Sequence, residues 1–334
     1  MIARIICCCQ ALVVGMIVFR TPQSVHAQAR IEIHPVETVT VTTKQFLLGD
    51  KGGKATTLAA ELRIPTIAAG KMPAVILVHG SGGLQGFHGR WADELNSIGV
   101  AVLLLDSFTG RGITSTVNDQ SQLDTLAMMI DAYHALGMLA QDSRIDPTRI
   151  AVMGFSKGAV AAVYSSNERF RRMYAPSGVQ FAAHIGLYTP CETTYRDDDK
   201  LTGKPIRLFH GIADDYVPIG PCRDYVGRLK RAGADVALTE YPGAYHAFDN
   251  VARKNDPEPF QLADATTTRN CQLAEGDGGV IINSKTGKAY SLASDPCVER
   301  GPHVAYNEAA TVATVKAVKQ FLATVFDLKG QALR

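Results

Sequence analysis

The sequence has 334 residues, of which 46% are hydrophobic and 20% are charged. This composition can supply a full hydrophobic core and excludes an intrinsically disordered chain. The formal net charge is only +2, so the sequence has no excess of basic residues of the kind that proteins use to bind nucleic acid. We therefore expect no nucleic-acid partner.

Residues 1–27 are typical of a secretory signal peptide. Arg4 precedes an apolar stretch from Ile5 to Phe19, and small residues lead to Ala27. The stretch has about fifteen residues, fewer than the roughly 20 that a spanning helix needs, so we expect cleavage near Ala27 rather than a retained anchor. The mature chain would be residues 28–334, periplasmic or secreted by a bacterium, with no stable membrane anchor.

The cysteines predict disulfides in that mature chain. Three of the seven cysteines, Cys7–Cys9, lie in the signal segment, which leaves four. An even number in an exported chain favours two disulfides over buried thiols. We favour Cys191 with Cys222, because both lie on loops expected at one sheet edge, and Cys271 with Cys297, because they bracket one polar segment. The sequence leaves the other pairings open.

Short runs rich in Val, Ile and Leu alternate with segments of helical periodicity along the mature chain. This alternation predicts an α/β fold, a mostly parallel central sheet with helices on both faces. Two segments rich in Thr and Val, 31–48 and 56–64, come first and predict antiparallel strands at the leading edge. The runs that predict the later strands are 74–78, 100–105, 150–153, 181–187, 206–209 and 236–241.

Two helices follow from apolar residues spaced three and four apart. The first stripe runs from Leu126 to Leu136, and Asp146-Pro147 is expected to stop the chain before the next strand. The second stripe runs from Val315 to Val325 and predicts a last helix that packs back onto the sheet.

The segment from about 255 to 303 lacks this periodicity and is rich in Gly, Asp and Pro. We interpret it as an insertion in a single domain, bracketed by Cys271 and Cys297, between the last strand and the last helix. Within it, residues 280–283 and 288–290 predict a hairpin.

A candidate nucleophile lies in the sequence Gly-Phe-Ser-Lys-Gly at residues 154–158. This G-x-S-x-G pattern follows the predicted strand 150–153 and opens an alanine-rich helical segment, the context of a nucleophile elbow. In such a turn the serine is held in a strained conformation, and side chains at the flanking positions would collide with the neighbouring strand and helix. Ser156 is therefore the predicted nucleophile.

A serine hydroxyl needs a base to take its proton and a carboxylate to orient that base. Asp214 follows the predicted strand 206–209, and His246 follows the strand 236–241. The chain order Ser, Asp, His is that of α/β-hydrolases, and each residue comes just after the carboxyl end of a strand, where open parallel sheets bind ligands. Asp215 is the alternative acid. His246 is preferred to the other histidines because it alone follows the last strand.

Three of those other histidines have structural interpretations. His79 and His210 belong to strand-end turns, where a buried histidine can serve hydrogen bonding, and His184 lies within an apolar strand. Four aromatic residues are candidates for lining the acyl or alcohol pocket, although core positions are the alternative: Trp91, Phe108, Tyr188 and Tyr216.

The oxyanion that forms on an attacked carbonyl requires two preorganised N–H donors. We expect one from the amide of Lys157, directly after the nucleophile. The other is expected from the Gly-rich loop 79–83, with Ser81 preferred and Gly82 second. A phosphate cradle is the alternative for this loop, but the loop lacks both G-x-G-x-x-G and a G-K-S/T ending.

The motifs together resemble the dienelactone hydrolase family of the α/β-hydrolase superfamily. The resemblance rests on segments 75–83, 105–112, 154–158, 210–218 and 241–248, and it extends over roughly residues 74–250 plus the final helix. It implies that Ser156, Asp214 and His246 are nucleophile, acid and base in hydrolysis of an ester or lactone through an acyl-enzyme. The name-giving enzymes have cysteine at the elbow, whereas Ser156 points to ordinary ester chemistry.

The predicted function is thus that of a carboxylic ester hydrolase acting on a small ester or lactone. No cofactor or metal is expected, because no histidine and carboxylate cluster has ligand spacing. A peptidase of the same superfamily and a non-catalytic binding protein on the same fold are the alternatives.

Overall fold

The computed structural model of the chain describes residues 29–66 and 70–328. Its centre is an eight-stranded sheet in the order β1-β2-β4-β3-β5-β6-β8-β9. β1 pairs antiparallel with β2 and β2 with β4, while all later pairs are parallel. The predicted α/β fold with a mostly parallel sheet is confirmed. The strands are β1 (Ala29–Thr40), β2 (Lys54–Pro65), β3 (Met72–Val78), β4 (Ala101–Asp106), β5 (Ile145–Phe155), β6 (His184–Leu187), β8 (Ile206–Gly211) and β9 (Val236–Tyr241).

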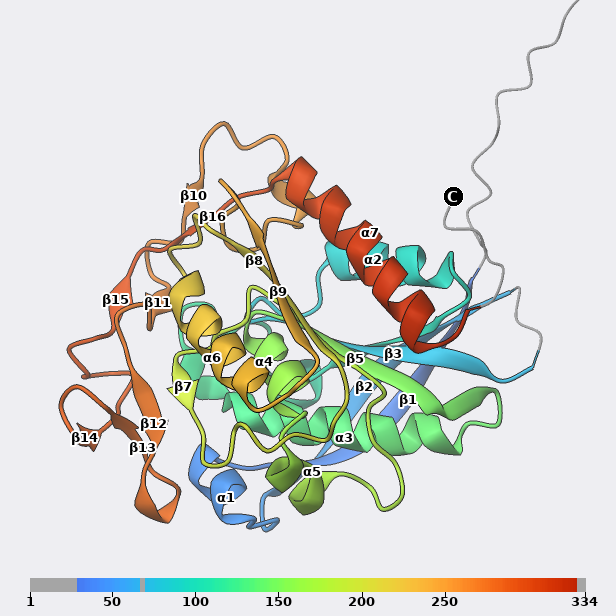
Figure 1. Cartoon of the computed structure of the whole chain (residues 1–334), viewed down its shortest axis with the longest axis horizontal. Coiled ribbons are helices and arrows are strands. Elements are labelled where there is room, and N and C mark those ends of the chain that lie inside the picture. Colours follow the sequence, from blue (N-terminus) through green and yellow to red (C-terminus); the bar gives the residue numbers. More distant parts are fainter. Residues whose placement is uncertain (1–28, 67–69, 329–334) are drawn as a thin grey trace, which may run out of the picture.

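Helices cover both faces of the sheet (Figure 1). Along β3, Val75 and Leu77 face one layer and Ile76 and Val78 face the other, because successive side chains of a strand point to opposite sides. The first layer contains α2 (Gly86–Asn96) and α7 (Glu308–Val325). The second layer contains α1 (Thr43–Leu48), α3 (Thr125–Gln141), α4 (Lys157–Tyr164), α5 (Glu168–Tyr174) and α6 (Ile219–Arg231).

The predicted first strand, 31–48, is wrong at its end, because β1 stops at Thr40 and residues 43–48 form helix α1. The cause is a capping box. The Thr42 side chain accepts a hydrogen bond from the Gln45 amide, and the Gln45 side chain accepts one from the Thr42 amide. Gly49 then ends the helix in the left-handed conformation with φ 73°.

Two other boundaries differ from the prediction. Asp146 and Pro147 do not precede the strand but lie inside β5, where the register against β3 shifts between Met72 and Ala74. Residues 146–149 have no partner in β3 at this shift, and Pro147 fits there because it has no N–H to donate to a ladder. β6 begins at His184, later than the expected residue 181, although Phe181 is buried and stacks on Tyr133.

The strands of the segment 255–303 are all short and lie to the left in Figure 1, and one 3-10 helical turn, η4 (Asp277–Gly279), lies among them. The predicted hairpin is present, with β13 (Ile281–Asn283) antiparallel to β14 (Lys288–Ala289). β12 (Leu273–Glu275) joins this hairpin to β7 (Thr193–Thr194), the short strand after β6. The segment is thereby hydrogen-bonded to the main body. Its other strands are β10 (Phe260–Gln261), β11 (Thr266–Thr267), β15 (Glu299–Arg300) and β16 (His303–Val304).

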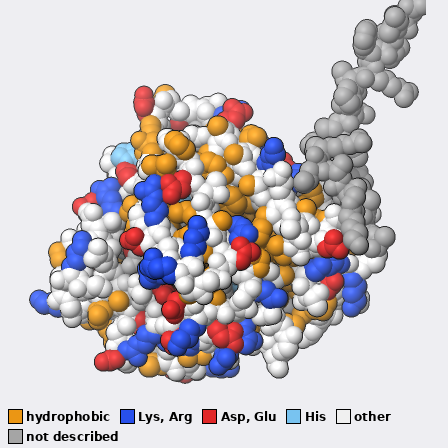
Figure 2. Space-filling model, in the orientation of Figure 1, with side chains coloured by type: hydrophobic (Ala, Val, Ile, Leu, Met, Phe, Trp, Pro, Cys, Tyr) orange, Lys and Arg blue, Asp and Glu red, His pale blue; other side chains and the backbone are white. Residues whose placement is uncertain are grey.

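Acidic and basic side chains are interspersed over the face in Figure 2, in keeping with the small net charge. Among the described residues, no helix is both long and apolar enough to cross a bilayer. The predicted signal peptide, 1–27, lies outside the residues that the structure describes.

Candidate active site

Ser156 occupies a strained turn between β5 and α4. Its backbone has φ 51° and ψ −118°, and positive φ is rare for a residue with a side chain. A Cβ at Gly154 would collide with the backbone of Gly158, and a Cβ at Gly158 would collide with the carbonyl groups of β3 and His79. Only glycine at these two positions allows the turn to pack this closely.

Asp214 and His246 come from the loops after β8 and β9, which are hydrogen-bonded to each other. Ile212 donates its N–H to the Tyr241 carbonyl at 2.9 Å, and Ala213 donates to the Ala244 carbonyl at 3.0 Å. These bonds bring the two loops together at the carboxyl edge of the sheet, where Ser156 also lies.

The structure brings Ser156, Asp214 and His246 into one hydrogen-bonded row. The Nε2 atom of His246 lies 2.9 Å from the Oγ atom of Ser156, and its Nδ1 atom lies 2.8 Å from Oδ2 of Asp214. Asp214 and His246 are buried, each being 4% exposed, whereas Ser156 is partly exposed. A histidine held between a hydroxyl and a buried carboxylate can accept the hydroxyl proton.

The two acidic neighbours have different partners. The Oδ1 atom of Asp214 accepts hydrogen bonds from the amides of Tyr216 at 3.0 Å and Val217 at 2.8 Å, which leaves Oδ2 for His246. Asp215 instead binds His303, with Oδ1 accepting from the amide and Oδ2 lying 2.8 Å from Nδ1. Asp215 is therefore directed at the segment 255–303 and not at His246.

The candidate oxyanion donors lie beside Ser156. Lys157 is the first residue of α4, so its amide has no carbonyl partner within that helix. Ser81 and Gly82 both line a small cavity together with Ser156 and His246. The preceding Gly80 is so close to the elbow that a Cβ would lie 3.0 Å from the Phe155 carbonyl oxygen. The geometry keeps both Ser81 and Gly82 as candidates.

A buried acid behind His246 escaped the sequence analysis. Asp249 accepts hydrogen bonds from the indole of Trp91 at 2.6 Å and the hydroxyl of Tyr188 at 2.9 Å. The Tyr188 ring in turn lies 4.7 Å from the His246 ring, centroid to centroid, and Tyr216 lies at the same distance from it. Burial raises the pKa of Asp249. Its position three residues after His246 was visible in the sequence, but its partners were not.

The side chain of Lys157 also lies at the site, although the G-x-S-x-G motif indicates a role only for its backbone amide. Its Nζ atom donates to the backbone carbonyl of Gln120 at 3.0 Å and to the side-chain oxygen of the same residue at 3.2 Å. Burial lowers the pKa of Lys157 to about 8. Gln120 also exchanges hydrogen bonds with the Ser81 hydroxyl, so Lys157 is connected to the Gly-rich loop 79–83.

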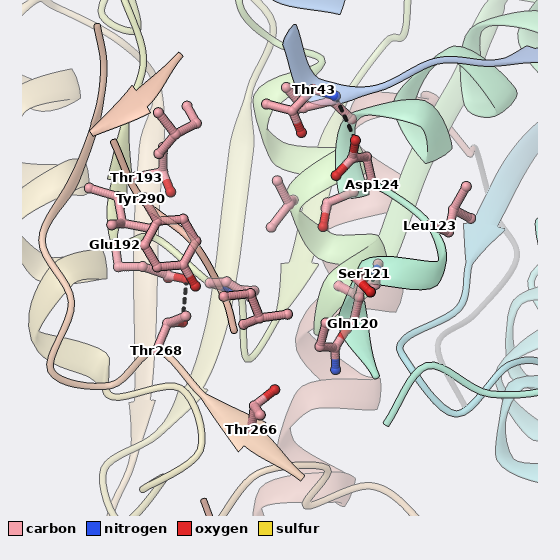
Figure 3. A pocket seen from close by; sticks show the side chains of 18 of the residues that line it. Thr43, Gln120, Ser121, Leu123, Asp124, Glu192, Thr193, Thr266, Thr268 and Tyr290 are labelled. Carbon is pink, nitrogen blue, oxygen red and sulfur yellow. Dashed lines mark hydrogen bonds between the residues drawn. The ribbon is translucent and has the colours of Figure 1, made fainter. Parts of the chain in front are cut away.

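Two cavities meet at Ser156. The larger has a volume of about 490 Å³ and reaches between helices α1, α3 and α4 on one side and the segment 255–303 on the other. Figure 3 shows its two walls, with Gln120 and Asp124 on one and Glu192 and Thr268 on the other. The smaller has a volume of about 140 Å³ and includes His246 in its lining.

Two of the four candidate aromatic residues line these cavities. Tyr216 borders both, and Tyr188 borders the smaller. Trp91 lines a separate groove between α2 and α7, and Phe108 is a core residue.

The other histidines that the sequence singled out have structural partners, as expected. His79 accepts the Ser107 amide at 3.1 Å, and His210 lies 2.7 Å from the Val217 carbonyl oxygen. His184 is buried and lies 2.9 Å from the carbonyl oxygen of Ala162.

Disulfides join Cys191 to Cys222 and Cys271 to Cys297, the pairs that the sequence favoured. Cys222 lies in the first turn of α6 rather than on a loop, which corrects the stated reason for the first pair. The second disulfide is internal to the segment 255–303. Within residues 29–66 and 70–328, no three His, Cys, Asp or Glu side chains are grouped so as to hold a metal ion.

Comparison with known proteins identifies a family. A family model described as the dienelactone hydrolase family matches residues 58–276. In sequence, an uncharacterized protein of Mycobacterium tuberculosis is 32% identical over 99 residues, which are 30% of this chain and 33% of the relative. The chain thus spans about a third of the length of the first curated relatives that it matches.

Solved structures share the fold. One described as m3DLH has a TM-score of 0.57 and 20% identity, covering 89% of this chain and 99% of its own. A dienelactone hydrolase-like promiscuous phosphotriesterase from metagenomic libraries has a TM-score of 0.55 and 15% identity, with the same coverage of 89% and 99%. An α/β hydrolase enzyme from a Medee basin deep-sea metagenome library has a TM-score of 0.51 and 16% identity, covering 81% and 93%. At these identities the likeness concerns the α/β-hydrolase fold.

Proposed function

The chain belongs to the dienelactone hydrolase family, and on that premise we propose that it is a serine hydrolase that cleaves carboxylic ester or lactone bonds through an acyl-enzyme. The observation that carries the proposal is the row of hydrogen bonds from Ser156 through His246 to Asp214. A serine with only a structural role would not need a strained backbone, a buried histidine and a buried carboxylate in line.

The proposed reaction begins when Ser156 Oγ attacks the substrate carbonyl and His246 Nε2 takes the hydroxyl proton. Asp214 holds the imidazole in the tautomer that leaves Nε2 free to accept, and it stabilises the imidazolium that forms. The amides of Lys157 and of Ser81 or Gly82 stabilise the oxyanion. His246 then gives its proton to the leaving alcohol, and water releases the acid from Ser156 by the same steps in reverse.

A fluorophosphonate probe followed by intact-mass analysis tests the nucleophile. We expect one covalent adduct on the native chain, located at Ser156 by peptide mapping, and none on Ser156→Ala. The same variant should be folded but inactive towards p-nitrophenyl acetate. Absence of the adduct on the native chain would favour a non-catalytic binding protein. Activity retained in Ser156→Ala would show that Ser156 is not the nucleophile.

A peptidase would use the same three residues, so the two functions are separated by turnover of an ester and an amide with matched acyl groups. We propose the ester. His246 has to protonate the leaving group in both reactions, but an alkoxide leaves more readily than the nitrogen of an amide. Faster turnover of the amide would reverse the assignment.

The proposed location is the periplasm or the exterior, with residues 1–27 as a cleaved signal and residues 28–334 as a single domain containing the insertion at about 255–303. Two disulfides support an oxidising, extracytoplasmic compartment, since such bonds are rare in reducing cytosol.

A further inference from the structure

Only one of the two cavities at Ser156 borders His246, the proposed base. Both include Ser156, Ser81 and Tyr216, but only the smaller, of about 140 Å³, is lined by His246. The leaving alcohol must receive its proton from His246 Nε2, so it has to lie on the side of the smaller cavity. The acyl group then extends into the larger cavity, of about 490 Å³. This division predicts a small alcohol and a large acyl group.

The insertion builds one wall of the larger cavity, and it is fixed in place. Leu273 donates its amide to the Glu192 carbonyl at 2.9 Å, in the parallel pairing of β12 with β7. The Thr267 hydroxyl donates to the Tyr216 carbonyl at 2.6 Å. Asp215 holds His303 at the far end of the insertion. The cavity is therefore preformed, and its volume lies within the range of sites that enclose a small molecule.

The walls carry many hydroxyl groups and the side-chain amide of Gln120. Figure 3 shows Thr266, Thr268 and Tyr290 on the insertion wall, opposite Gln120 and Ser121. Some of these groups already have partners within the protein, such as Thr268 with Glu192 and Gln120 with Ser81. Their hydroxyl oxygens can still accept hydrogen bonds from the hydroxyls of a ligand. Between the polar groups, aliphatic side chains line the same space and suit the C–H faces of a ring: Leu123, Val160, Leu273, Ile281 and Leu292.

Glu192 is the acidic group on the insertion side of this cavity. Its Oε1 atom accepts a hydrogen bond from the Thr268 hydroxyl at 2.7 Å. Burial raises the pKa of the Glu192 carboxyl. Its oxygens can accept hydrogen bonds from the hydroxyls of a ligand. Such a group matches the hydroxyls of a neutral polyhydroxylated ligand.

We propose that the larger cavity binds a polyhydroxylated acyl group, so that the substrate is an ester of a sugar acid with a small alcohol. This inference rests on the proposed ester hydrolysis. With a methyl ester, the bond from Ser156 Oγ to the acyl carbon forms and the bond from that carbon to the methoxy oxygen breaks. The methoxy oxygen leaves as methanol with the proton from His246, and water then yields the free sugar acid.

Two methyl esters of equal ring size test the proposal on the native chain. One is the methyl ester of methyl α-D-glucopyranosiduronic acid, and the other is methyl cyclohexanecarboxylate, which has the same leaving group and no ring hydroxyls. We expect kcat/KM to be about a hundredfold higher for the sugar ester, because a site built for hydroxyls discriminates strongly against analogues that lack them. Equal turnover, or faster turnover of the cyclohexane ester, would overturn the proposal.

Tyr290→Phe and Thr268→Val each remove one hydroxyl from the insertion wall. Each should lower the ratio of kcat/KM for the sugar ester over the cyclohexane ester by roughly tenfold, the worth of about one hydrogen bond. Thr286→Val is the matched control, because Thr286 lies in the turn of the β13–β14 hairpin and is absent from the cavity lining. The control should keep the native ratio. An unchanged ratio in both wall variants would overturn the assignment of this wall.

The two proposals fail in different ways. Loss of the proposed function would appear as no Ser156-dependent turnover of p-nitrophenyl acetate. Turnover of that ester by the native chain, without preference between the two methyl esters, would leave the serine hydrolase intact and overturn only the substrate class.

Discussion

Asp214 and Asp215 are adjacent in the chain, yet their carboxylates serve different histidines: Asp214 lies 2.8 Å from His246, and Asp215 lies 2.8 Å from His303. The turn after β8 gives the two consecutive side chains different partners. One carboxylate reaches the proposed catalytic base and the other holds the end of the insertion.

The pair gives a direct test of the proposed acid. Asp214→Asn should lower kcat for p-nitrophenyl acetate by about 10³–10⁴-fold, because the amide favours the wrong tautomer of His246. Asp215→Asn is the isosteric control, and it should keep kcat within about threefold, since its contact is with the insertion. Steady-state kinetics of both variants check this. A loss of kcat that is larger in Asp215→Asn than in Asp214→Asn would show that Asp215 is the acid.

The close packing of the turn at Ser156 should make any side chain at position 158 destabilising. Gly158→Ala should lower the free energy of unfolding by about 1–3 kcal/mol, because the new methyl group meets the carbonyl groups of Val78 and His79, which are backbone and cannot rotate away. Gly227→Ala is the control in helix α6, where the nearest atom to the added Cβ is an Arg231 side-chain nitrogen at 3.5 Å. That change should be neutral or stabilising by about 0.5–1 kcal/mol. Urea unfolding measures both, and equal effects would contradict the steric argument.

The buried Lys157 side chain should make the free energy of unfolding vary with pH in the alkaline range. Its pKa is lowered from 10.5 to about 8 in the folded chain, so between these values the unfolded chain binds more protons than the folded one. Stability from this residue therefore rises with pH across that window, at about 1.4 kcal/mol for each unit of difference in pKa. Lys157→Met lacks the titrating group but keeps the backbone amide.

We expect the free energy of unfolding of the native chain to gain roughly 2 kcal/mol relative to Lys157→Met between pH 7 and 10. Chemical unfolding of both proteins at several pH values measures the difference, and the titration of all other groups cancels in it. A difference that is constant with pH, or that falls, would contradict the burial of a charged Lys157.

The disulfide between Cys271 and Cys297 should stabilise the segment 255–303 locally. Cys271→Ser with Cys297→Ser opens a loop with a sequence separation of 26 residues, which should cost about 3 kcal/mol. Because both cysteines lie within 255–303, amide hydrogen exchange should accelerate there and remain slow in β3 and β5. Cys191→Ser with Cys222→Ser is the control, and its faster exchange should centre on α6 and the segment after β6. Equal acceleration throughout the sheet in the first variant would show that the insertion does not unfold by itself.

Part of the candidate site follows from short stretches of sequence. The Gly-x-Ser-x-Gly spacing indicates the turn at Ser156, because glycine is the only residue without a Cβ to collide at 154 and 158. The apolar runs indicate the strands, and a parallel sheet places the residues after each strand at one edge. Asp214 and His246 could be selected in this way because their strands were recognisable.

Other features depend on contacts between segments that are distant in the chain. The Thr43–Leu48 helix is favoured by the Thr42 and Gln45 cap and by burial of Phe46 against Phe170, which outweigh the β-forming Thr and Val residues nearby. The network of Trp91, Tyr188 and Asp249 joins three parts of the chain that no local periodicity relates.

The sequence by itself determined the α/β fold and the tight turn at Ser156. The fold follows from the alternation of apolar runs with segments of helical periodicity, and the turn follows from the glycines two positions before and after the serine. Only the tertiary structure decided which carboxylate faces His246, what surrounds Lys157 and which groups line the cavity between the insertion and the main body. These depend on how separate loops pack, and packing is set by the shape and hydrogen bonding of surfaces that meet only in the folded chain.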